Sequence, residues 1–243
     1  MAEEGVKYDS SSLRLCVSGG SAIPDDIVER FKKYYGVSLL QLWGLTEATA
    51  LVTLQPLDGT GKLGSVGKVQ PGWELKVVDD SGKELPLNQP GELILRGPIM
   101  KGYYRNPQAT AETIKNGWLY TGDIGTIDED GDVFISGRKK DMIIVKGQNI
   151  YPSDIEDVLY TNPKVAEAAV VGITDELRGE AVRAVISLKE GGVSTEQEIK
   201  QFCIERMASY KVPKQVIFMD SLPKTAAGQI HKQELCFNLA PAL

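Results

Sequence analysis

A carboxylate and a guanidinium flank a short segment that has the sequence of a β-hairpin. Asp123 closes the motif Tyr-Thr-Gly-Asp, and Arg138 follows the glycine of Gly-Arg-Lys-Lys-Asp. Between them we expect two strands, residues 124–128 and 133–136, joined by the turn sequence Glu-Asp-Gly-Asp. A carboxylate accepts hydrogen bonds from vicinal hydroxyls and an arginine holds an anion, so the pair could bind a phosphorylated polyol. The alternative is a surface hairpin that carries an ion pair.

A second group of chemically useful side chains lies in Trp-Gly-Leu-Thr-Glu, residues 43–47, directly after the apolar segment 37–42. Ligands of α/β proteins gather where strands end. Thr46 offers a hydroxyl to a phosphate oxygen, Glu47 offers Mg²⁺ a hard oxygen ligand, and Trp43 offers an aromatic face to a base. The alternative is that Thr46 and Glu47 only cap a helix.

Composition excludes several other kinds of site. The chain has 243 residues and a net charge of -6, which argues against general nucleic-acid binding because phosphate contacts need a basic surface. The single histidine argues against a zinc site and a Ser-His-Asp triad. The three cysteines lack paired spacing and indicate free thiols in a reducing compartment. Without a signal core or a membrane-length apolar run, the sequence predicts a cytoplasmic protein with no transmembrane segment.

The first half of the chain must position these motifs with an α/β layer and a β-rich region. A strand over residues 13–18, a helix after Pro24 and a strand over 37–42 form a strand-helix-strand unit. Gly20 and Ser21 follow the first strand, where a glycine allows a ligand to approach closely, although a plain turn is the alternative. Short strands separated by turn residues then suggest a small barrel or curled sheet.

The second half reads as a compact α+β domain with the order β-α-β-β-α-β. The sequence Ser-Thr-Glu-Gln-Glu at residues 194–198 has the character of a capping box. The expected strands are 142–145, 165–173, 181–188 and 216–219, the expected helices are 152–160 and 194–207, and residues 146–149 are expected to form a loop.

Four motifs in this order resemble the adenylate-forming superfamily, which comprises acyl-CoA synthetases, firefly luciferase and the adenylation domains of non-ribosomal peptide synthetases. They are the two motifs around Asp123 and Arg138, the one at residues 43–47, and Leu-Pro-Lys-Thr-Ala-Ala-Gly at residues 222–228. The chain is most similar to the fatty-acid–CoA ligases. The resemblance implies formation of an acyl-adenylate from ATP and a carboxylic acid, followed by transfer of the acyl group to CoA.

The resemblance also implies roles for individual residues. Asp123 would hold the ribose hydroxyls with help from Arg138, and Trp43 would lie against the adenine, where the family more often has Tyr. Thr46 would contact phosphate, and Glu47 would bind the Mg²⁺ that neutralises charge on ATP. The remaining nucleotide-binding residues would be Gly20 and Ser21, which border the adenine and the acyl pocket, and Gly44.

The same resemblance divides the chain into two domains. Residues 1–138 would be the C-terminal part of a large domain, with a β subdomain over about residues 62–138. Residues 139–243 would be a small mobile domain with its hinge at Lys140, unless Lys140 belongs to an ordinary solvated lysine pair. Gly147 would line the channel for the pantetheine arm of CoA.

The sequence departs from the family pattern in two places. The phosphate loop that family members carry upstream of Gly20 does not occur, and residues 58–63 only imitate one because Leu63 replaces the required Ser or Thr. The terminal loop has Gln229 where the family has a catalytic lysine, and glutamine carries no charge. Lys224 or Lys232 could substitute, although neither occupies the motif position. We therefore expect the chain alone to be inactive in adenylation.

Three functional hypotheses follow. The first is the C-terminal portion of an acyl-CoA ligase that activates a fatty acid, with the missing N-terminal half as a possible partner. The second is a truncated relative without catalysis that binds nucleotide, CoA or protein. The third is a ligase for an aryl or amino acid. Most acyl-pocket residues would lie upstream, so the sequence leaves the choice of acid open. A luciferase is disfavoured, since the chain ends without a peroxisomal address and nothing indicates oxygenation.

Overall fold

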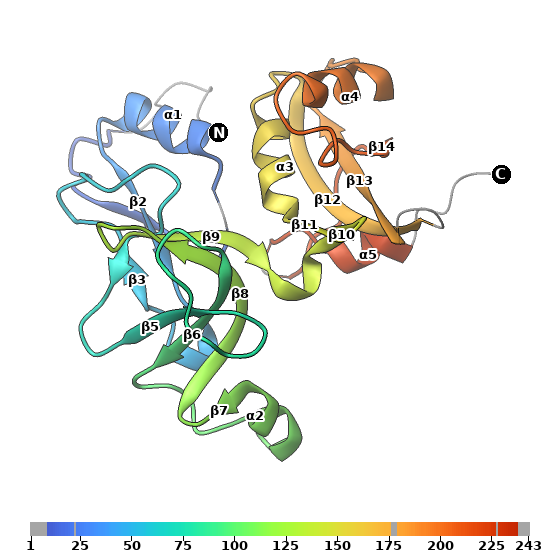
Figure 1. Ribbon diagram of the computed structural model, residues 1–243. Helices are drawn as coiled ribbons and strands as arrows, with labels where there is room; N and C mark the ends of the chain where they lie inside the picture. The colour runs from blue at the N-terminus through green and yellow to red at the C-terminus, as the bar shows by residue number, and fades with distance from the viewer. Residues whose placement is uncertain (1–8, 22, 176–178, 227, 238–243) are drawn as a thin grey trace. The chain divides into compact units, whose positions relative to one another are not determined.

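The computed structural model describes residues 9–21, 23–175, 179–226 and 228–237. The chain divides into two compact units, Met1–Ser136 and Gly137–Leu243 (Figure 1). The fold is mixed α/β, as the sequence predicted, with a layered segment and a β-rich segment in the first unit and an α+β arrangement in the second. In the part of the chain that is described, no helix combines the length and the apolar character needed to cross a membrane.

The first unit begins with a four-stranded sheet of order β1-β2-β3-β4, in which β1 and β2 are parallel. Helix α1 connects these two strands. It carries Asp25 and Asp26 in its first turn and ends at Gly36 in the left-handed conformation, as the dipole and capping preferences favour. The elements are β1 (Cys16–Ser18), α1 (Asp25–Tyr35), β2 (Leu39–Trp43), the 3₁₀ helix η1 (Thr46–Ala48), β3 (Thr53–Leu54) and β4 (Lys68–Val69).

A five-stranded antiparallel sheet completes the first unit, in the order β5-β6-β8-β7 with β9 paired to β8. Strand β8 is long and bends along its course (Figure 1). Val77, Leu93, Leu95 and Leu119 from this sheet form one apolar core with Trp43. The elements are β5 (Glu74–Val78), β6 (Gly91–Arg96), α2 (Pro107–Thr113), β7 (Ile114–Lys115), β8 (Trp118–Ile127) and β9 (Val133–Arg138).

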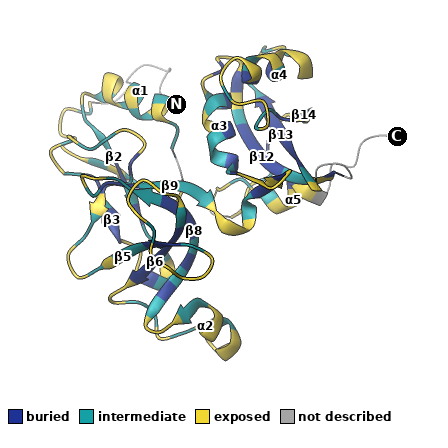
Figure 2. Ribbon diagram, in the orientation of Figure 1, coloured by how far each residue is buried: buried dark blue, intermediate teal, exposed yellow. Residues whose placement is uncertain are grey.

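The second unit is built around the hairpin of β12 and β13, which pair from Val165 opposite Leu188 to Asp175 opposite Gly179. Both strands are mostly buried (Figure 2) because helices cover both of their faces. The elements are η2 (Lys139–Asp141), β10 (Ile143–Val145), β11 (Gln148–Ile150), α3 (Pro152–Tyr160), β12 (Val165–Asp175), β13 (Gly179–Leu188), α4 (Glu196–Ile204), β14 (Gln215–Phe218) and α5 (Lys232–Phe237).

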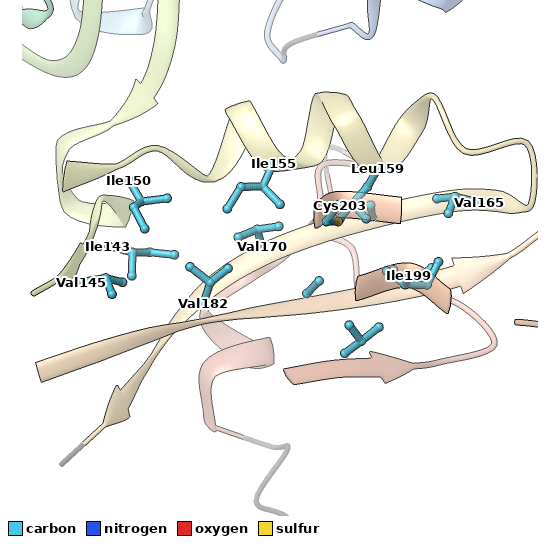
Figure 3. Packing of buried hydrophobic residues seen from close by; sticks show 14 residues of the cluster. Ile143, Val145, Ile150, Ile155, Leu159, Val165, Val170, Val182, Ile199 and Cys203 are labelled. Carbon is cyan, nitrogen blue, oxygen red and sulfur yellow. The ribbon is translucent and has the colours of Figure 1, made fainter. Parts of the chain in front are cut away.

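The alternation of side chains along β12 and β13 distributes most of their buried apolar residues between two cores. Ile155 and Leu159 of α3 pack with Val170 and Val182 on one face (Figure 3), where Ile199 and Cys203 of α4 join them. On the other face, Ala169, Val171 and Val185 pack with Leu222 and with Leu235 of α5.

Besides the short 3₁₀ helix η2, two elements of the second unit differ from the sequence prediction. Residues Gln148–Ile150 form strand β11 rather than a loop, and Lys232–Phe237 form helix α5, for which no element was predicted. Strand β11 is a polar edge strand with two exposed residues, so it has no apolar alternation to reveal it. Helix α5 is one and a half turns long and buries Leu235, too short a pattern for periodicity to detect.

Candidate functional site

The sequence suggested that Asp123 lies ahead of a strand that begins at residue 124. In the structure, Asp123 lies within strand β8. The pairing of β6 with β8 explains how the side chain is aimed. Glu92 pairs with Ile124 and Ile94 pairs with Tyr120, so β8 carries extra residues across Thr121–Asp123. Such a bulge locally re-aims side chains and is common beside functional sites.

The Tyr-Thr-Gly-Asp motif supplies the bonds that hold this bulge. Gly122 has a φ of 70°, a left-handed conformation that glycine adopts without strain. The Thr121 hydroxyl donates to the Leu93 carbonyl over 2.7 Å and accepts from the Asp123 N–H over 3.0 Å. The buried Glu92 carboxylate accepts from the Gly122 N–H over 3.1 Å. Sequence reasoning did not identify Glu92 as part of the site, since its bond to Gly122 appears only when β6 and β8 pair.

Trp43 contacts the carboxylate from a different sheet. Its indole Nε1 donates a hydrogen bond to Asp123 Oδ2 over 2.9 Å, across 80 residues of sequence. Only 8% of Trp43 and 4% of Asp123 are exposed. Two residues that were predicted to bind nucleotide from separate motifs are therefore in direct contact.

Thr46 and Glu47 follow Trp43 in a tight turn. The Leu45 carbonyl accepts hydrogen bonds from the N–H groups of Ala48 (2.9 Å) and Ala50 (3.0 Å), and the chain returns to pair Val52 with Trp43. Leu45 is the N-cap of η1, with no side-chain capping bond, so Thr46 does not cap a longer helix. The exposed Thr46 hydroxyl and the half-buried Glu47 carboxylate are displayed by a rigid turn at the end of β2.

A partner of Glu47 was missing from the sequence prediction. The Tyr103 hydroxyl donates to Glu47 Oε1 over 2.8 Å, and the Met100 N–H donates to the Glu47 carbonyl over 2.7 Å. Burial, together with the Glu47 carboxylate, raises the pKa of Tyr103 above its ordinary value, so the phenol stays protonated as a donor at neutral pH. No spacing signal in the sequence joins residues 47 and 103.

Gly20 and Ser21 follow β1, and Gly44 follows β2. Because Ser18 pairs in parallel with Gln41, both segments leave the same edge of the sheet. They therefore lie at the edge from which the Thr46–Ala48 turn also emerges. Gly20 and Ser21 are exposed.

The described residues contain no group of three or more His, Cys, Asp or Glu side chains arranged to hold a metal ion. A single carboxylate such as Glu47 fits the way Mg²⁺ binds alongside substrate phosphates, with one or two carboxylates and several waters.

The other predicted residues belong to the second unit. Arg138 ends β9 and Lys140 lies in η2, and both are exposed. Lys146 and Gly147 form the two-residue turn between β10 and β11, with φ values of 51° and 80°. Gly147 is exposed.

Gln229 lies in a small hairpin loop in which Lys224 pairs with Ile230. The Thr225 N–H donates to the Gln229 carbonyl over 2.7 Å, which closes the loop. The two lysines considered as substitutes are both engaged in ion pairs. Lys224 lies 2.5 Å from Glu167, and Lys232 lies 2.6 Å from Glu156.

Comparison with known proteins gives matches to both halves of the chain. The AMP-binding enzyme family profile matches residues 1–104, and the AMP-binding enzyme C-terminal domain profile matches residues 154–229. A long-chain-fatty-acid–CoA ligase of Escherichia coli O6:H1 is 45% identical over 234 residues, covering 96% of this chain and 42% of that protein. An indoleacetate–CoA ligase of Aromatoleum aromaticum is 40% identical over 229 residues, covering 93% of this chain and 45% of that protein.

A solved structure extends the match to three dimensions. The anthranilate CoA ligase AuaEII in complex with anthranoyl-AMP superimposes with a TM-score of 0.87 and 37% identity, covering 94% of this chain and 45% of that one. This chain thus spans less than half the length of each of these proteins.

Proposed function

The chain belongs to the AMP-binding enzyme family, and from this we propose that it is a portion of an ATP-dependent acyl-CoA ligase. Such a ligase activates a carboxylic acid as acyl-AMP and transfers the acyl group to the thiol of CoA. The observation that carries the proposal is the buried bond between Trp43 Nε1 and Asp123 Oδ2. It unites two motifs that are 80 residues apart and that the resemblance assigns to one nucleotide.

In this proposal the first unit binds the adenylate. Asp123 accepts hydrogen bonds from the ribose hydroxyls, and Trp43 lies against the adenine. Gly20, Ser21 and Gly44 line the nucleotide at the sheet edge. Thr46 contacts phosphate, and Glu47 holds Mg²⁺ together with the phosphates of ATP. The ion would supply charge neutralisation on the triphosphate.

The chain from the end of β9 onward, in this proposal, contributes residues that act at different stages. Arg138 assists in holding the ribose, and Lys140 is the hinge between a large domain over residues 1–138 and a small domain over 139–243. Gly147 lines the pantetheine channel of CoA. Gln229 stands where the family has its adenylation lysine.

We also propose that the protein is cytoplasmic. A second proposal is that residues 1–243 alone form little or no acyl-adenylate. The amide of Gln229 can donate a hydrogen bond, but it has no positive charge to stabilise the negative charge at the carboxylate and the α-phosphate during adenylation. The ion pairs of Lys224 and Lys232 oppose a substitution by either lysine.

The acid that we propose as substrate is a fatty acid, in keeping with the 45% identity to a long-chain-fatty-acid–CoA ligase. An aryl acid is the competing choice, since an indoleacetate–CoA ligase is 40% identical. Competition between a fatty-acyl and an aryl-acyl adenylate mimic for the same site would separate the two.

An additional polypeptide is a further proposed partner. Helix α1 has no buried residue, although its apolar side chains share one face. Four apolar side chains in this region are exposed by 39–43%: Leu13, Leu15, Val17 and Ile27. These exposed apolar side chains would suit contact with a polypeptide corresponding to the rest of the relatives' length.

A non-catalytic nucleotide- or CoA-binding protein is the second candidate function, and Gln229 is the observation that favours it. Pyrophosphate release distinguishes the two candidates when this chain is joined to the upstream part of a relative. Release of pyrophosphate by the joined protein carrying Gln229→Lys supports the ligase, and nucleotide binding without release by that same variant supports the binding protein.

Isothermal titration of residues 1–243 with a non-hydrolysable acyl-adenylate mimic tests the shared nucleotide site. We expect binding that Asp123→Asn weakens about 10- to 100-fold, since hydrogen bonds to a charged group contribute about 1.5–3 kcal/mol. The matched control is Asp58→Asn, which makes the same change at an exposed turn carboxylate. Equal binding by Asp123→Asn and wild type would contradict the proposal.

A further inference from the structure

The hydrogen bond between Trp43 and Asp123 has a geometry that stacking against a base does not require. Stacking uses the face of an indole, whereas this bond uses its edge, through Nε1. Both groups are more than nine-tenths buried, at 8% and 4% exposure. A hydrogen bond to a carboxylate in such a place is strong, because water does not compete for it.

Two independent restraints meet at Asp123. The bulge across Thr121–Asp123 fixes the backbone, with Asp123 N–H bonded to the Thr121 hydroxyl over 3.0 Å. The indole then fixes the rotation of the carboxylate by occupying Oδ2. The terminal torsion of an aspartate is broad and roughly two-fold, so the backbone alone leaves the carboxylate orientation open.

We propose that Trp43 is a positioning residue, whose indole N–H orients the Asp123 carboxylate to accept the ribose hydroxyls of the nucleotide. This inference rests on the proposed function. Each carboxylate oxygen accepts more than one hydrogen bond, so a bond from the indole leaves acceptor capacity for hydroxyls. An indole is a donor only, and so it holds Asp123 without competing for the hydroxyl protons.

The proposal predicts that Trp43 affects ribose recognition separately from base stacking. We would titrate residues 1–243 with AMP and with 2′,3′-dideoxy-AMP, for wild type and for Trp43→Phe. Phenylalanine keeps an aromatic face but has no N–H. The wild-type protein should bind AMP more tightly than 2′,3′-dideoxy-AMP, by about 10-fold or more, because only AMP has the two hydroxyls that donate to the carboxylate. In Trp43→Phe this ratio should fall to about 3-fold or less, because the carboxylate loses the indole bond that aims it at the hydroxyls.

A second replacement removes the N–H with almost no change of shape. Incorporation of β-(3-benzothienyl)alanine at position 43 puts sulfur in place of the indole N–H, so it keeps the proposal testable even if Trp43→Phe does not fold. The same loss of the AMP preference is expected. Trp118→Phe, at a half-buried tryptophan beside Arg96, serves as the control and should retain the wild-type ratio.

The outcomes separate this inference from the proposed function. If either replacement lowers the affinities for AMP and 2′,3′-dideoxy-AMP by the same factor, Trp43 has a stacking role alone. That result would overturn the positioning role but would leave the proposed nucleotide site standing. An unchanged ratio in the benzothienyl protein would overturn it as well. Failure of the wild-type chain to bind either nucleotide would contradict the proposed function and, with it, this inference.

Discussion

The Tyr103 hydroxyl donates a hydrogen bond to Glu47 Oε1 over 2.8 Å, joining the segment before α2 to the turn after β2. The main chain reinforces the contact, because the Met100 N–H donates to the Glu47 carbonyl over 2.7 Å. The Tyr103 N–H in turn donates to Thr110 Oγ1 over 2.9 Å, which ties Tyr103 to α2. The Glu47 carboxylate, which we propose as a Mg²⁺ ligand, is thus oriented by Tyr103, a residue from a different segment of the chain.

Replacing Tyr103 by Phe should weaken the Mg²⁺ dependence of nucleotide binding. Loss of a residue that orients a metal ligand costs about 10- to 100-fold in metal affinity, and because Glu47 is only half-buried we expect an effect near the lower end. The measurement is a titration of ATP affinity against Mg²⁺ concentration, with Tyr104→Phe, 84% exposed, as the control. Identical Mg²⁺ curves for Tyr103→Phe and wild type would show that the phenol does not position Glu47.

The turn between β8 and β9 predicts a pH-dependent stability. Lys62 Nζ lies 2.5 Å from Asp128, 2.6 Å from Asp130 and 3.9 Å from Asp132. The Lys62 ammonium lowers the pKa of Asp128 below its usual value, so this carboxylate stabilises the fold above about pH 4, its pKa in an unfolded chain. That contribution is lost as the pH falls through the lowered pKa.

Lys62→Met should therefore destabilise the protein most at neutral pH, where three carboxylates would repel one another. The difference in urea midpoint between variant and wild type should be largest at pH 7 and should shrink as the pH falls through the lowered pKa of Asp128, where the ion pair with Lys62 is lost. Lys83→Met, at an exposed lysine in another turn, is the control. A difference that stays constant as the pH falls would exclude this electrostatic role.

The elements that the sequence predicted well are those that carry their own local signals. Residues 152–160 were predicted as a helix and form α3, which begins with Pro152 at a position where proline is favoured. The capping box was also correct, since Thr195 accepts from the Glu198 N–H and the Glu198 side chain accepts from the Thr195 N–H. The expected strands 165–173 and 181–188 match β12 and β13 to within two residues at each end.

The sequence indicated which residues could form the site, from their side-chain chemistry, but it could not predict the contacts between them. The bulge at Gly122 interrupts the alternation of β8, so the strand was expected to begin at residue 124 instead of at Trp118. The bonds from Trp43 to Asp123 and from Tyr103 to Glu47 cross 80 and 56 residues of sequence. Such bonds depend on how β2, β8 and the segment before α2 pack, which no local pattern records.

Gly147 provides a test that separates a turn role from a channel role. Both Lys146 and Gly147 have positive φ values, 51° and 80°, as a type I′ hairpin turn requires. Asparagine tolerates this conformation but has a side chain, so Gly147→Asn should preserve the thermal midpoint within a few degrees. If Gly147 lines the pantetheine channel, the same variant should slow transfer of the acyl group to CoA while leaving adenylation unchanged.

The transfer measurement for Gly147→Asn requires this chain joined to the upstream part of a relative, with acyl-adenylate supplied. Asn149→Gly, at an exposed position on β11, is a control for side-chain changes close to the turn. Normal transfer by a stably folded Gly147→Asn protein would assign Gly147 to the turn alone.

Restoring a lysine at position 229 should raise adenylation sharply. In a protein that joins this chain to the upstream part of a relative, Gln229→Lys should increase the rate of pyrophosphate release by about 10²- to 10³-fold. Gln233→Lys, an exposed position on α5, adds the same charge nearby and should have no such effect. Equal rates for Gln229→Lys and the parent protein would mean that the missing lysine does not limit adenylation.

A crystal structure of this chain with a non-hydrolysable acyl-adenylate mimic tests the nucleotide site most directly. We predict that the ribose hydroxyls lie within hydrogen-bonding distance of Asp123, with the indole of Trp43 still bonded to Oδ2 and the phosphate mimic beside Thr46. A mimic that binds elsewhere, or that reaches Thr46 while Asp123 stays without a ribose contact, would contradict the account.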